Sequence, residues 1–343
     1  MSGADFRSDT ITRPSARMRA AMAEAEVGDD VLDGDPTVRA LEAEAAAWLG
    51  QPGALFVPSG TMANQVALGA WTRPGDEIVV QRYAHVTTYE AGAAGYLHGL
   101  QSITLGGIEG DLDPAEFQAA LRPLYIHCPR TALLCLEQTH NVAGGRVMPL
   151  ERFDALTSAA RAAGVPVHLD GARLANAVVA SGVPGSEWGR RVDSVSLCFS
   201  KGLGAPVGSV IAGGPEFLER AKLVRKRLGG WMRQCGILAA AARMALAENV
   251  ARLADDHRVA RDIAARLGRV PGLAADVEGV HTNIANVQVV RGDLDAARVA
   301  AALAEHDVQV FAMGPRTLRF VAHMDLAPDA AARLESAARR VLA

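Results

Sequence analysis

The spacing of hydrophobic positions changes along the chain and divides it into two parts. From about residue 53 to residue 240, short apolar segments alternate with stretches whose apolar residues recur at helical spacing. This alternation is typical of βαβ units around a mainly parallel sheet. Several of the apolar segments are β-branched and unalternating, as expected of strands covered on both faces. The predicted strands are Ala54–Val57, Glu77–Gln81, Ser102–Leu105, Thr131–Glu137, Val165–Asp170, Ser194–Phe199 and Gly208–Ala212.

Helix signals fit the same interpretation, and a different pattern follows it. One predicted helix, Thr61–Ala70, opens at a Ser-Gly-Thr sequence, and another, Arg152–Ala163, lies between a proline and a glycine. After residue 240 the chain changes to long helices rich in Ala, Arg and Leu. The segments beyond them are predicted as a strand over Asn283–Val290, a helix over Leu294–Glu305, and strands over Val308–Phe311 and Thr317–Ala322.

These two patterns predict a large α/β domain and a smaller α+β domain. The chain has 343 residues, which exceeds what one hydrophobic core usually serves. We expect an N-terminal segment, 1–24, that packs with the small domain, a large domain over 25–245, and the small domain over 246–343.

Composition narrows the classes of partner and location. The net charge is −3 and only 5% of residues are aromatic, so the basic field and stacking groups of a nucleic-acid binder are missing. No apolar run is long enough for a membrane span, and the first residues have no apolar signal region. The four cysteines lack C-x-x-C spacing, which argues against a zinc site or a disulfide framework. We expect a cytoplasmic protein that binds a small molecule and needs no metal.

Polar residues that could act in catalysis or ligand binding stand where three predicted strands end. Asp170 closes one strand, Ser200 and Lys201 follow another, and Gly60 and Thr61 lead from a third into a helix. The carboxyl ends of parallel strands are where ligands bind in such sheets. A helix N-terminus offers free N–H groups and a positive dipole end to an anion such as a phosphate.

Each of these signals has an ordinary explanation when taken alone. Small hydroxyl residues cap helices, an aspartate often forms a turn, and a lysine after a strand is usually solvated. Together, however, they match pyridoxal phosphate (PLP), which needs a Schiff-base lysine, a carboxylate facing its pyridinium nitrogen and a phosphate site. The 31 residues from Asp170 to Lys201 leave room for one crossover helix. Competing cofactor motifs, G-x-x-x-x-G-K-[ST], G-x-S-x-G and H-E-x-x-H, are absent from the sequence.

Ordered motifs along almost the whole chain resemble the PLP-dependent L-threonine aldolases. This resemblance implies the fold of fold-type I PLP enzymes, with a mainly parallel seven-stranded sheet covered by helices in the large domain. The motifs are Asp5-Phe6-Arg7-Ser8-Asp9-Thr10, Glu26-Val27-Gly28-Asp29-Asp30-Val31, Phe56-Val57-Pro58-Ser59-Gly60-Thr61-Met62, Leu136-Glu137-Gln138-Thr139-His140-Asn141, His168-Leu169-Asp170-Gly171-Ala172-Arg173, Ser200-Lys201-Gly202-Leu203-Gly204-Ala205-Pro206-Val207-Gly208-Ser209 and Met232-Arg233-Gln234.

The resemblance also implies roles for residues around the cofactor. Lys201 matches the Schiff-base lysine, Asp170 the partner of the pyridinium nitrogen, and Gly60 and Thr61 the phosphate ligands, with Ser200 also expected at the cofactor. His85 matches the histidine that stacks on the cofactor ring. His127 matches a second histidine near the substrate hydroxyl. Either histidine could act as the general base, because imidazole titrates near working pH.

Further matches concern the substrate and a neighbouring subunit. The carboxylate of an α-amino acid fits the fork of an arginine, and the resemblance points to Arg173 and Arg319, with Ser8 as an additional donor. Lys226 and Arg233 match basic residues near the cofactor phosphate, contributed across a subunit interface in a homotetramer. Lys226 otherwise has the character of a solvated helix face.

The resemblance implies retro-aldol cleavage of L-threonine or L-allo-threonine to glycine and an aldehyde. Another PLP reaction, β-elimination or transamination, remains an alternative, as does a non-catalytic binding protein on the same fold. Three positions depart from the family pattern: Thr87 where an aromatic residue is frequent, Leu32 where tyrosine is common, and Trp231 in place of a glycine. We therefore expect a preference for a bulkier β-substituent, as in phenylserine.

Overall fold

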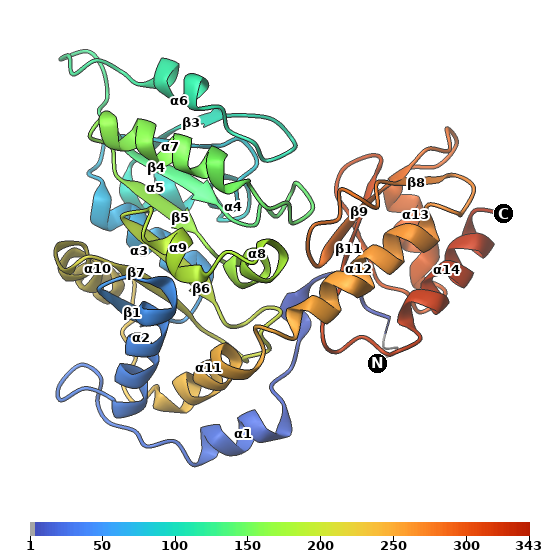
Figure 1. The fold of residues 1–343 in the computed structure, drawn as a ribbon, viewed down its shortest axis with the longest axis horizontal. Coiled ribbons are helices and arrows are strands. Elements are labelled where there is room, and N and C mark those ends of the chain that lie inside the picture. The colour runs from blue at the N-terminus through green and yellow to red at the C-terminus, as the bar shows by residue number, and fades with distance from the viewer. Residues whose placement is uncertain (1–3) are drawn as a thin grey trace.

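The computed structural model describes residues 4–343 and contains two sheets in two lobes (Figure 1). The larger lobe holds a seven-stranded sheet of order β1-β7-β6-β5-β4-β2-β3. Only β7 runs against the other strands, since it pairs antiparallel with both β1 and β6. The strands are β1 (Gly53–Val57), β2 (Glu77–Gln81), β3 (Gln101–Leu105), β4 (Thr131–Glu137), β5 (Val167–Asp170), β6 (Ser194–Cys198) and β7 (Ser209–Gly213).

Helices cover both faces of this sheet, and β1 shows why. Leu55 and Val57 of β1 point into a core with α3 and α10, whereas Ala54 and Phe56 point into the core on the α2 side. Successive strand residues face opposite sides, so a strand buried on both faces must be apolar throughout. The helices of this lobe are α1 (Ala16–Ala23), α2 (Pro36–Leu49), α3 (Gly60–Trp71), α4 (His85–Thr88), α5 (Ala93–His98), α6 (Pro114–Ala120), α7 (Leu150–Ala162), α8 (Leu174–Ser181), α9 (Gly185–Gly189), α10 (Pro215–Arg227) and α11 (Gly236–Glu248).

Capping residues set the helix ends that matter for the site. The Ser59 side chain accepts from the Met62 amide at 3.1 Å and so fixes the start of α3. Asp35 caps α2 by accepting from the amides of Thr37 and Val38, and Gly50 ends that helix in the left-handed region at φ +63°. The first-turn amides of α3 that Ser59 leaves unused point beyond the carboxyl end of β1.

The smaller lobe is a four-stranded antiparallel sheet of order β10-β11-β9-β8 with three helices. It has its own hydrophobic core, in which Phe6 from the N-terminal segment packs edge-on against Phe320 with ring centroids 6.0 Å apart. Its elements are α12 (Leu253–Leu267), β8 (Leu273–Ala275), β9 (Ile284–Val289), α13 (Ala296–Ala304), β10 (Phe311–Ala312), β11 (Thr317–Val321) and α14 (Ala330–Val341). A short 3-10 turn, Asp9–Ile11, carries the N-terminal segment back toward the large lobe, where α1 packs on α11 (Figure 1).

The predicted α/β architecture is confirmed, and most strand positions agree within one or two residues. The exception is the strand predicted over Val308–Phe311, which is wrong except at Phe311. Gln309 instead forms an isolated bridge with Asp5, so the N-terminal segment takes the pairing that a sheet neighbour would have supplied. Within residues 4–343, no helix is long and apolar enough to cross a bilayer. The four cysteines are unpaired, and all but Cys128 are buried.

Candidate active site

A cavity of about 400 Å³ lies between the two lobes, beyond the carboxyl ends of the large sheet's strands. Five of the predicted site residues line it: Ser8, His85, Arg173, Lys201 and Arg319. They come from the N-terminal segment, from loops after β2, β5 and β6, and from β11. The other lining residues are Thr10, Tyr89, Asn141, Phe311, Ala312 and Met313. Segments that lie far apart in sequence therefore meet at one polar cavity.

Asp170 ends β5 as a fully buried, ionised carboxylate close to this cavity. Its oxygens accept from Asn64 Nδ2 at 2.7 Å and from the Ala172 amide at 3.0 Å. Burial opposes ionisation, but the charges of His85 and Lys201 and these hydrogen bonds lower the pKa of Asp170 below its usual range. An anionic carboxylate next to a lysine amine is the pair of groups that the ring nitrogen and the aldehyde carbon of PLP require.

The N-terminus of α3 has the features that an anion site needs. Gly60 is half-buried and Thr61 exposed, so their amides are accessible from outside the helix. A Cβ at Gly60 would lie 2.6 Å from the Cys198 sulfur of β6, so no side chain fits between the helix end and the sheet. The glycine lets the helix start sit directly against the strand ends, where a phosphate could approach the amides.

His85 opens α4 and is held at both its main chain and its ring. Its amide donates to Glu137 Oε2 at 2.7 Å, and its Nδ1 lies 2.8 Å from Glu90 Oε1. Burial would lower the pKa of His85, but the hydrogen bond that Glu90 accepts and the charge of Asp170 raise it above the ordinary value. Tyr89 stands beside it, with ring centroids 5.7 Å apart. The ring is thus fixed at the edge of the cavity.

Arg173 is already occupied by a buried carboxylate. Its Nε and Nη2 donate to the two oxygens of Asp9 at 2.9 and 2.7 Å, and neither side chain is more than 6% exposed. Asn283 donates a further hydrogen bond to Asp9 at 3.1 Å. Burial alone would raise the pKa of Asp9, but Arg173, with help from Lys201, lowers it to about 2. This ion pair ties the N-terminal segment to the loop after β5.

Arg319 has more unused hydrogen-bonding capacity than Arg173. Both guanidinium groups donate through Nη1 to the same oxygen, Asn141 Oδ1, each at 3.1 Å. The remaining bond of Arg319 is a long one, 3.4 Å from Nη2 to the Arg7 carbonyl, and its buried Nε has no partner among the described residues. Asn141 therefore holds two like charges side by side at the cavity, an arrangement that a ligand carboxylate would complete.

The structure does not bring the other predicted residues to this cavity. His127 is exposed on the loop before β4, next to Tyr125 with ring centroids 5.1 Å apart. Lys226 is exposed near the end of α10, and Arg233 is an exposed residue paired with Asp29 at 3.1 Å. Ser200 is half-buried next to Lys201 but outside the lining set.

The positions that depart from the family pattern also lie outside the lining of the cavity. Leu32 is 75% exposed, and Thr87 turns its hydroxyl to the Ala84 carbonyl at 3.0 Å. Trp231 donates from Nε1 to Asp30 at 2.7 Å, and its ring lies 4.7 Å from the guanidinium carbon of Arg225. Nothing in one chain links these side chains to the choice of substrate.

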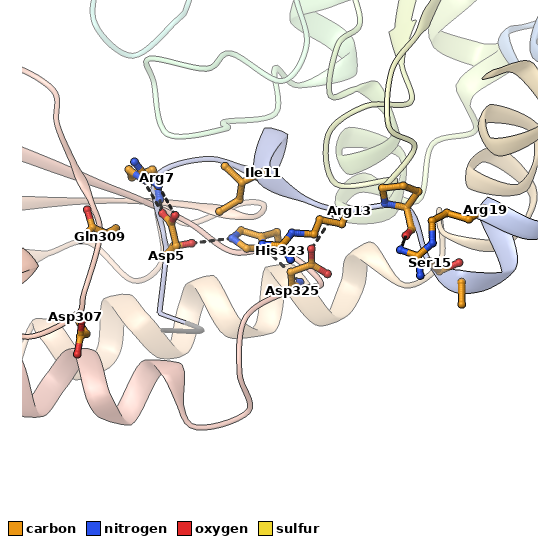
Figure 2. Close-up of a pocket in the computed structure, with 12 residues that line it drawn as sticks. Asp5, Arg7, Ile11, Arg13, Ser15, Arg19, Asp307, Gln309, His323 and Asp325 are labelled. Atoms are coloured by element: carbon orange, nitrogen blue, oxygen red, sulfur yellow. Dashed lines mark hydrogen bonds and ion pairs between the residues drawn. The ribbon is translucent and has the colours of Figure 1, made fainter. Parts of the chain in front are cut away.

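A second cavity, of about 900 Å³, lies along the N-terminal segment (Figure 2). Several of its polar groups have partners: Arg7 pairs with Asp5, and His323 bonds to the Asp5 carbonyl at 2.8 Å. Asp325 accepts from the Arg13 amide at 2.9 Å. The predicted residues Lys201, His85, Arg173 and Arg319 all line the smaller cavity and none of them lines this one, so the smaller cavity is the candidate active site.

Four polar residues of the site were not identified from the sequence. Asp9 and Asn141 lie inside motifs that drew attention for other residues, and each bonds an arginine at the cavity. Asn64 and Glu90 sit behind Asp170 and His85. The only sequence signal for Asn64 is that it falls one turn after the Ser-Gly-Thr helix start, and Glu90 has no signal.

Comparison with known proteins gives a consistent result. The sequence model of the family described as Beta-eliminating lyase matches residues 5–290. The chain is 42% identical to low-specificity L-threonine aldolase 1 of Arabidopsis thaliana over 94% of this chain and 92% of that protein. It is 41% identical to the low specificity L-threonine aldolase of Escherichia coli K12 over 99% of both chains. The solved structure of Leishmania major threonine aldolase superposes with a TM-score of 0.83 at 19% identity, over 99% of both chains.

Proposed function

The chain belongs to the beta-eliminating lyase family, and from this membership we propose that it cleaves β-hydroxy-α-amino acids by a retro-aldol reaction. Members of this family, threonine aldolases included, are PLP-dependent lyases. The substrates proposed are L-threonine, L-allo-threonine and relatives such as phenylserine, with glycine and an aldehyde as products. The observation that carries the proposal is the convergence of Lys201, Asp170, His85 and two arginines around one cavity.

The residues present fit PLP. Lys201 supplies the amine, Asp170 an ionised carboxylate and the α3 N-terminus at Gly60 and Thr61 the amides for a phosphate, with Ser200 adjacent. His85 provides a flat ring at the cavity edge. When bound, the cofactor supplies an electron sink for the bond that breaks at the substrate's α-carbon.

Two arginines orient the substrate in this proposal. Arg319 carries donors that the protein leaves unused, so it takes the substrate carboxylate, and Arg173 adds its charge from the other side of Asn141. Ser8 can donate as well, because its oxygen only accepts from Thr10 in this structure. Clamping the carboxylate decides which bond at the α-carbon is aligned for cleavage.

A base must take the proton of the β-hydroxyl group as the Cα–Cβ bond breaks and the aldehyde leaves. We assign this role to His85, which lines the cavity, while His127 stays a second candidate that lies outside it in one chain. A raised pKa makes the neutral ring of His85 a stronger base. The α-carbon must gain one proton to give glycine, so the proton held on His85, or one from solvent, goes to that carbon and His85 returns to its neutral form.

We extend the proposal to assembly, domains and location. Lys226 and Arg233 are both exposed, and we assign them to contacts with the cofactor phosphate of a neighbouring subunit in a homotetramer. The division into 1–24, 25–245 and 246–343 is proposed as the domain organisation, in keeping with the two separate cores. A cytoplasmic location is proposed because the cysteines are unpaired.

One experiment tests the function. Purified protein is loaded with PLP and incubated with L-threonine, L-allo-threonine, phenylserine or the D-isomers, and the aldehyde and glycine released are measured. We expect both products in equal amounts from L-substrates, with kcat/KM for phenylserine above that for threonine. The Lys201→Ala variant should give neither product and should lose the visible absorbance of the lysine-bound cofactor. Pyruvate in place of aldehyde would identify a β-eliminating enzyme, and a protein that cannot bind PLP would overturn the proposal.

A further inference from the structure

We propose that Glu90 is a positioning residue for the reaction, because its buried carboxylate holds His85 in the tautomer whose Nε2 faces the cavity as a proton acceptor. This inference rests on the proposed function and deepens it. Glu90 follows α4, five residues after His85, and its side chain is fully buried. Nothing in the sequence pattern marks it.

Three donors converge on the Glu90 carboxylate. Oε1 lies 2.8 Å from His85 Nδ1 and accepts from Asn64 Nδ2 at 2.8 Å, while Oε2 accepts from Gln65 Nε2 at 2.6 Å. Both carboxylate oxygens therefore act as acceptors, Oε1 toward Asn64 and Oε2 toward Gln65. The oxygen that accepts from the Asn64 amide is placed to accept from His85 as well, so the hydrogen at Nδ1 belongs to His85.

The orientation of Asn64 is set by the groups on its two sides. Its NH₂ group faces carboxylate oxygens that accept, so its Oδ1 accepts from His168 Nε2 at 3.1 Å. Burial lowers the pKa of His168 to about 4, so this ring stays neutral and its Nδ1 accepts from the Ser194 hydroxyl at 3.0 Å. Ser194 Oγ accepts in turn from Trp71 Nε1 at 2.9 Å, so each group in the chain has a matching partner.

That NH₂ group faces both carboxylates of the site. Asn64 Nδ2 lies 2.7 Å from Asp170 and 2.8 Å from Glu90, so one amide keeps each anion in place. His85, Glu90 and Asp170 each have one atom that could ligate a metal ion, and these three atoms lie within 4.8 Å of one another. An amide that donates to both carboxylates opposes a cation there, which favours the hydrogen-bonded arrangement.

The consequence for His85 follows from its two ring nitrogens. Nδ1 donates to Glu90, and among residues 4–343 no hydrogen bond to Nε2 occurs, so the lone pair of Nε2 is available at the cavity. The charged groups that face this ring are Glu90 and Asp170, which favour its protonation, and Lys201, which opposes it. Glu137 bonds the main-chain amide and not the ring.

The test uses Glu90→Gln, which removes the charge but keeps the shape. Gln65 can accept from the new amide, because its own Oε1 has no partner in the described structure. We expect the acid limb of the kcat/KM profile to move down by about one pH unit, and kcat to fall roughly 10- to 100-fold with little change in KM. A role confined to packing would lower thermal stability without moving this limb.

The matched control is Glu42→Gln, the same substitution at a carboxylate that accepts from the Phe56 amide and lies outside the lining of the cavity. This variant should keep the acid limb of the wild-type kcat/KM profile. A second measurement needs neither cofactor nor activity. In the cofactor-free protein, ¹⁵N NMR of the imidazoles, assigned with His85→Asn, should show the hydrogen on Nδ1 in the wild type and a lower titration midpoint in Glu90→Gln.

The two proposals fail in different ways. A wild type that releases no aldehyde would reject the aldolase, while the NMR measurement would still test the link between Glu90 and His85. An aldolase in which Glu90→Gln keeps the wild-type acid limb, or in which His85 carries its hydrogen on Nε2, would overturn the role of Glu90 alone. If Glu90→Gln does not fold, the tautomer of the wild type decides the matter.

Discussion

Replacing Asp9 by Asn should weaken both the folded state and the binding of amino acids. Asp9 is fully buried, and Arg173 faces it with two hydrogen bonds of 2.9 and 2.7 Å. The pKa of Asp9 falls from 3.8 to about 2 on folding. At roughly 1.4 kcal/mol per pKa unit, the ionised carboxylate contributes about 2.5 kcal/mol to the free energy of unfolding near pH 7.

The full loss should exceed this value, because the substitution also leaves the Arg173 guanidinium buried without its counter-charge. Removing one partner of a buried ion pair costs about 3–5 kcal/mol. We therefore expect a loss of about 3 kcal/mol and a fall in Tm of about 5 °C or more. KM for the amino acid should rise, since Arg173 would no longer be held toward Asn141.

The pH dependence provides a second signature of the pair. The pKa of Asp9 is lowered in the folded protein, so its stabilisation is complete above pH 3.8 and is lost as the pH falls toward 2. The variant should lack this loss in urea titrations between pH 5 and pH 2. Glu44→Gln is the control, because its pair with Arg243 is exposed and should be worth less than about 0.5 kcal/mol. An Asp9→Asn protein as stable as this control would refute the reasoning.

Three further substitutions follow from the structure. Arg319→Lys should raise KM for amino-acid substrates about tenfold or more, because the planar guanidinium fork is lost. Arg316→Lys is the control and should leave steady-state kinetics unchanged, because Arg316 is exposed and bonds only to main-chain carbonyls in the described structure. Burial raises the pKa of Glu42 from 4.5 to about 7, so the unfolded chain releases a proton that the folded protein keeps and stability falls as the pH rises through this range. Between pH 5 and pH 8 the wild type should lose about 2–3 kcal/mol more than Glu42→Gln in urea unfolding; parallel curves would contradict this. Gly60→Ala should weaken PLP binding in a spectrophotometric titration, since its Cβ would meet a buried thiol at 2.6 Å, and Gly107→Ala, which meets nothing within 4 Å, should bind as tightly as the wild type.

Much of the fold was predictable because the strands of the large sheet, apart from the edge strand β3, are buried on both faces. Glu77–Gln81 and Thr131–Glu137 were predicted at their observed bounds, since an unbroken apolar run bordered by turn residues leaves little choice of register. The pairing of Gln309 with Asp5 was not predictable, because it joins residues from opposite ends of the chain and has no local pattern.

The site residues also differ in whether the local sequence reveals them. Asp170 and Lys201 were identifiable because a polar residue at the end of an apolar strand stands out in sequence and must lie at the ligand-binding edge. Glu90 and Asn64 act through each other and through a histidine, so their meaning depends on contacts between separate helices. His127 illustrates the reverse case: the family motif marks it, but in a single chain it lies on the surface.

The pairing of β1 has a consequence for biosynthesis. Its one neighbour in the sheet is β7, so Val57 finds its partner Ser209 only after roughly 150 further residues have left the ribosome. Until then, the apolar side chains of β1 and the start of α3 at Gly60 lack the strand against which they pack in the folded protein. The proposed phosphate site at Gly60 and Thr61 should therefore be among the last parts to become ordered during translation. Nascent chains halted before β7 should depend on chaperones and bind no cofactor.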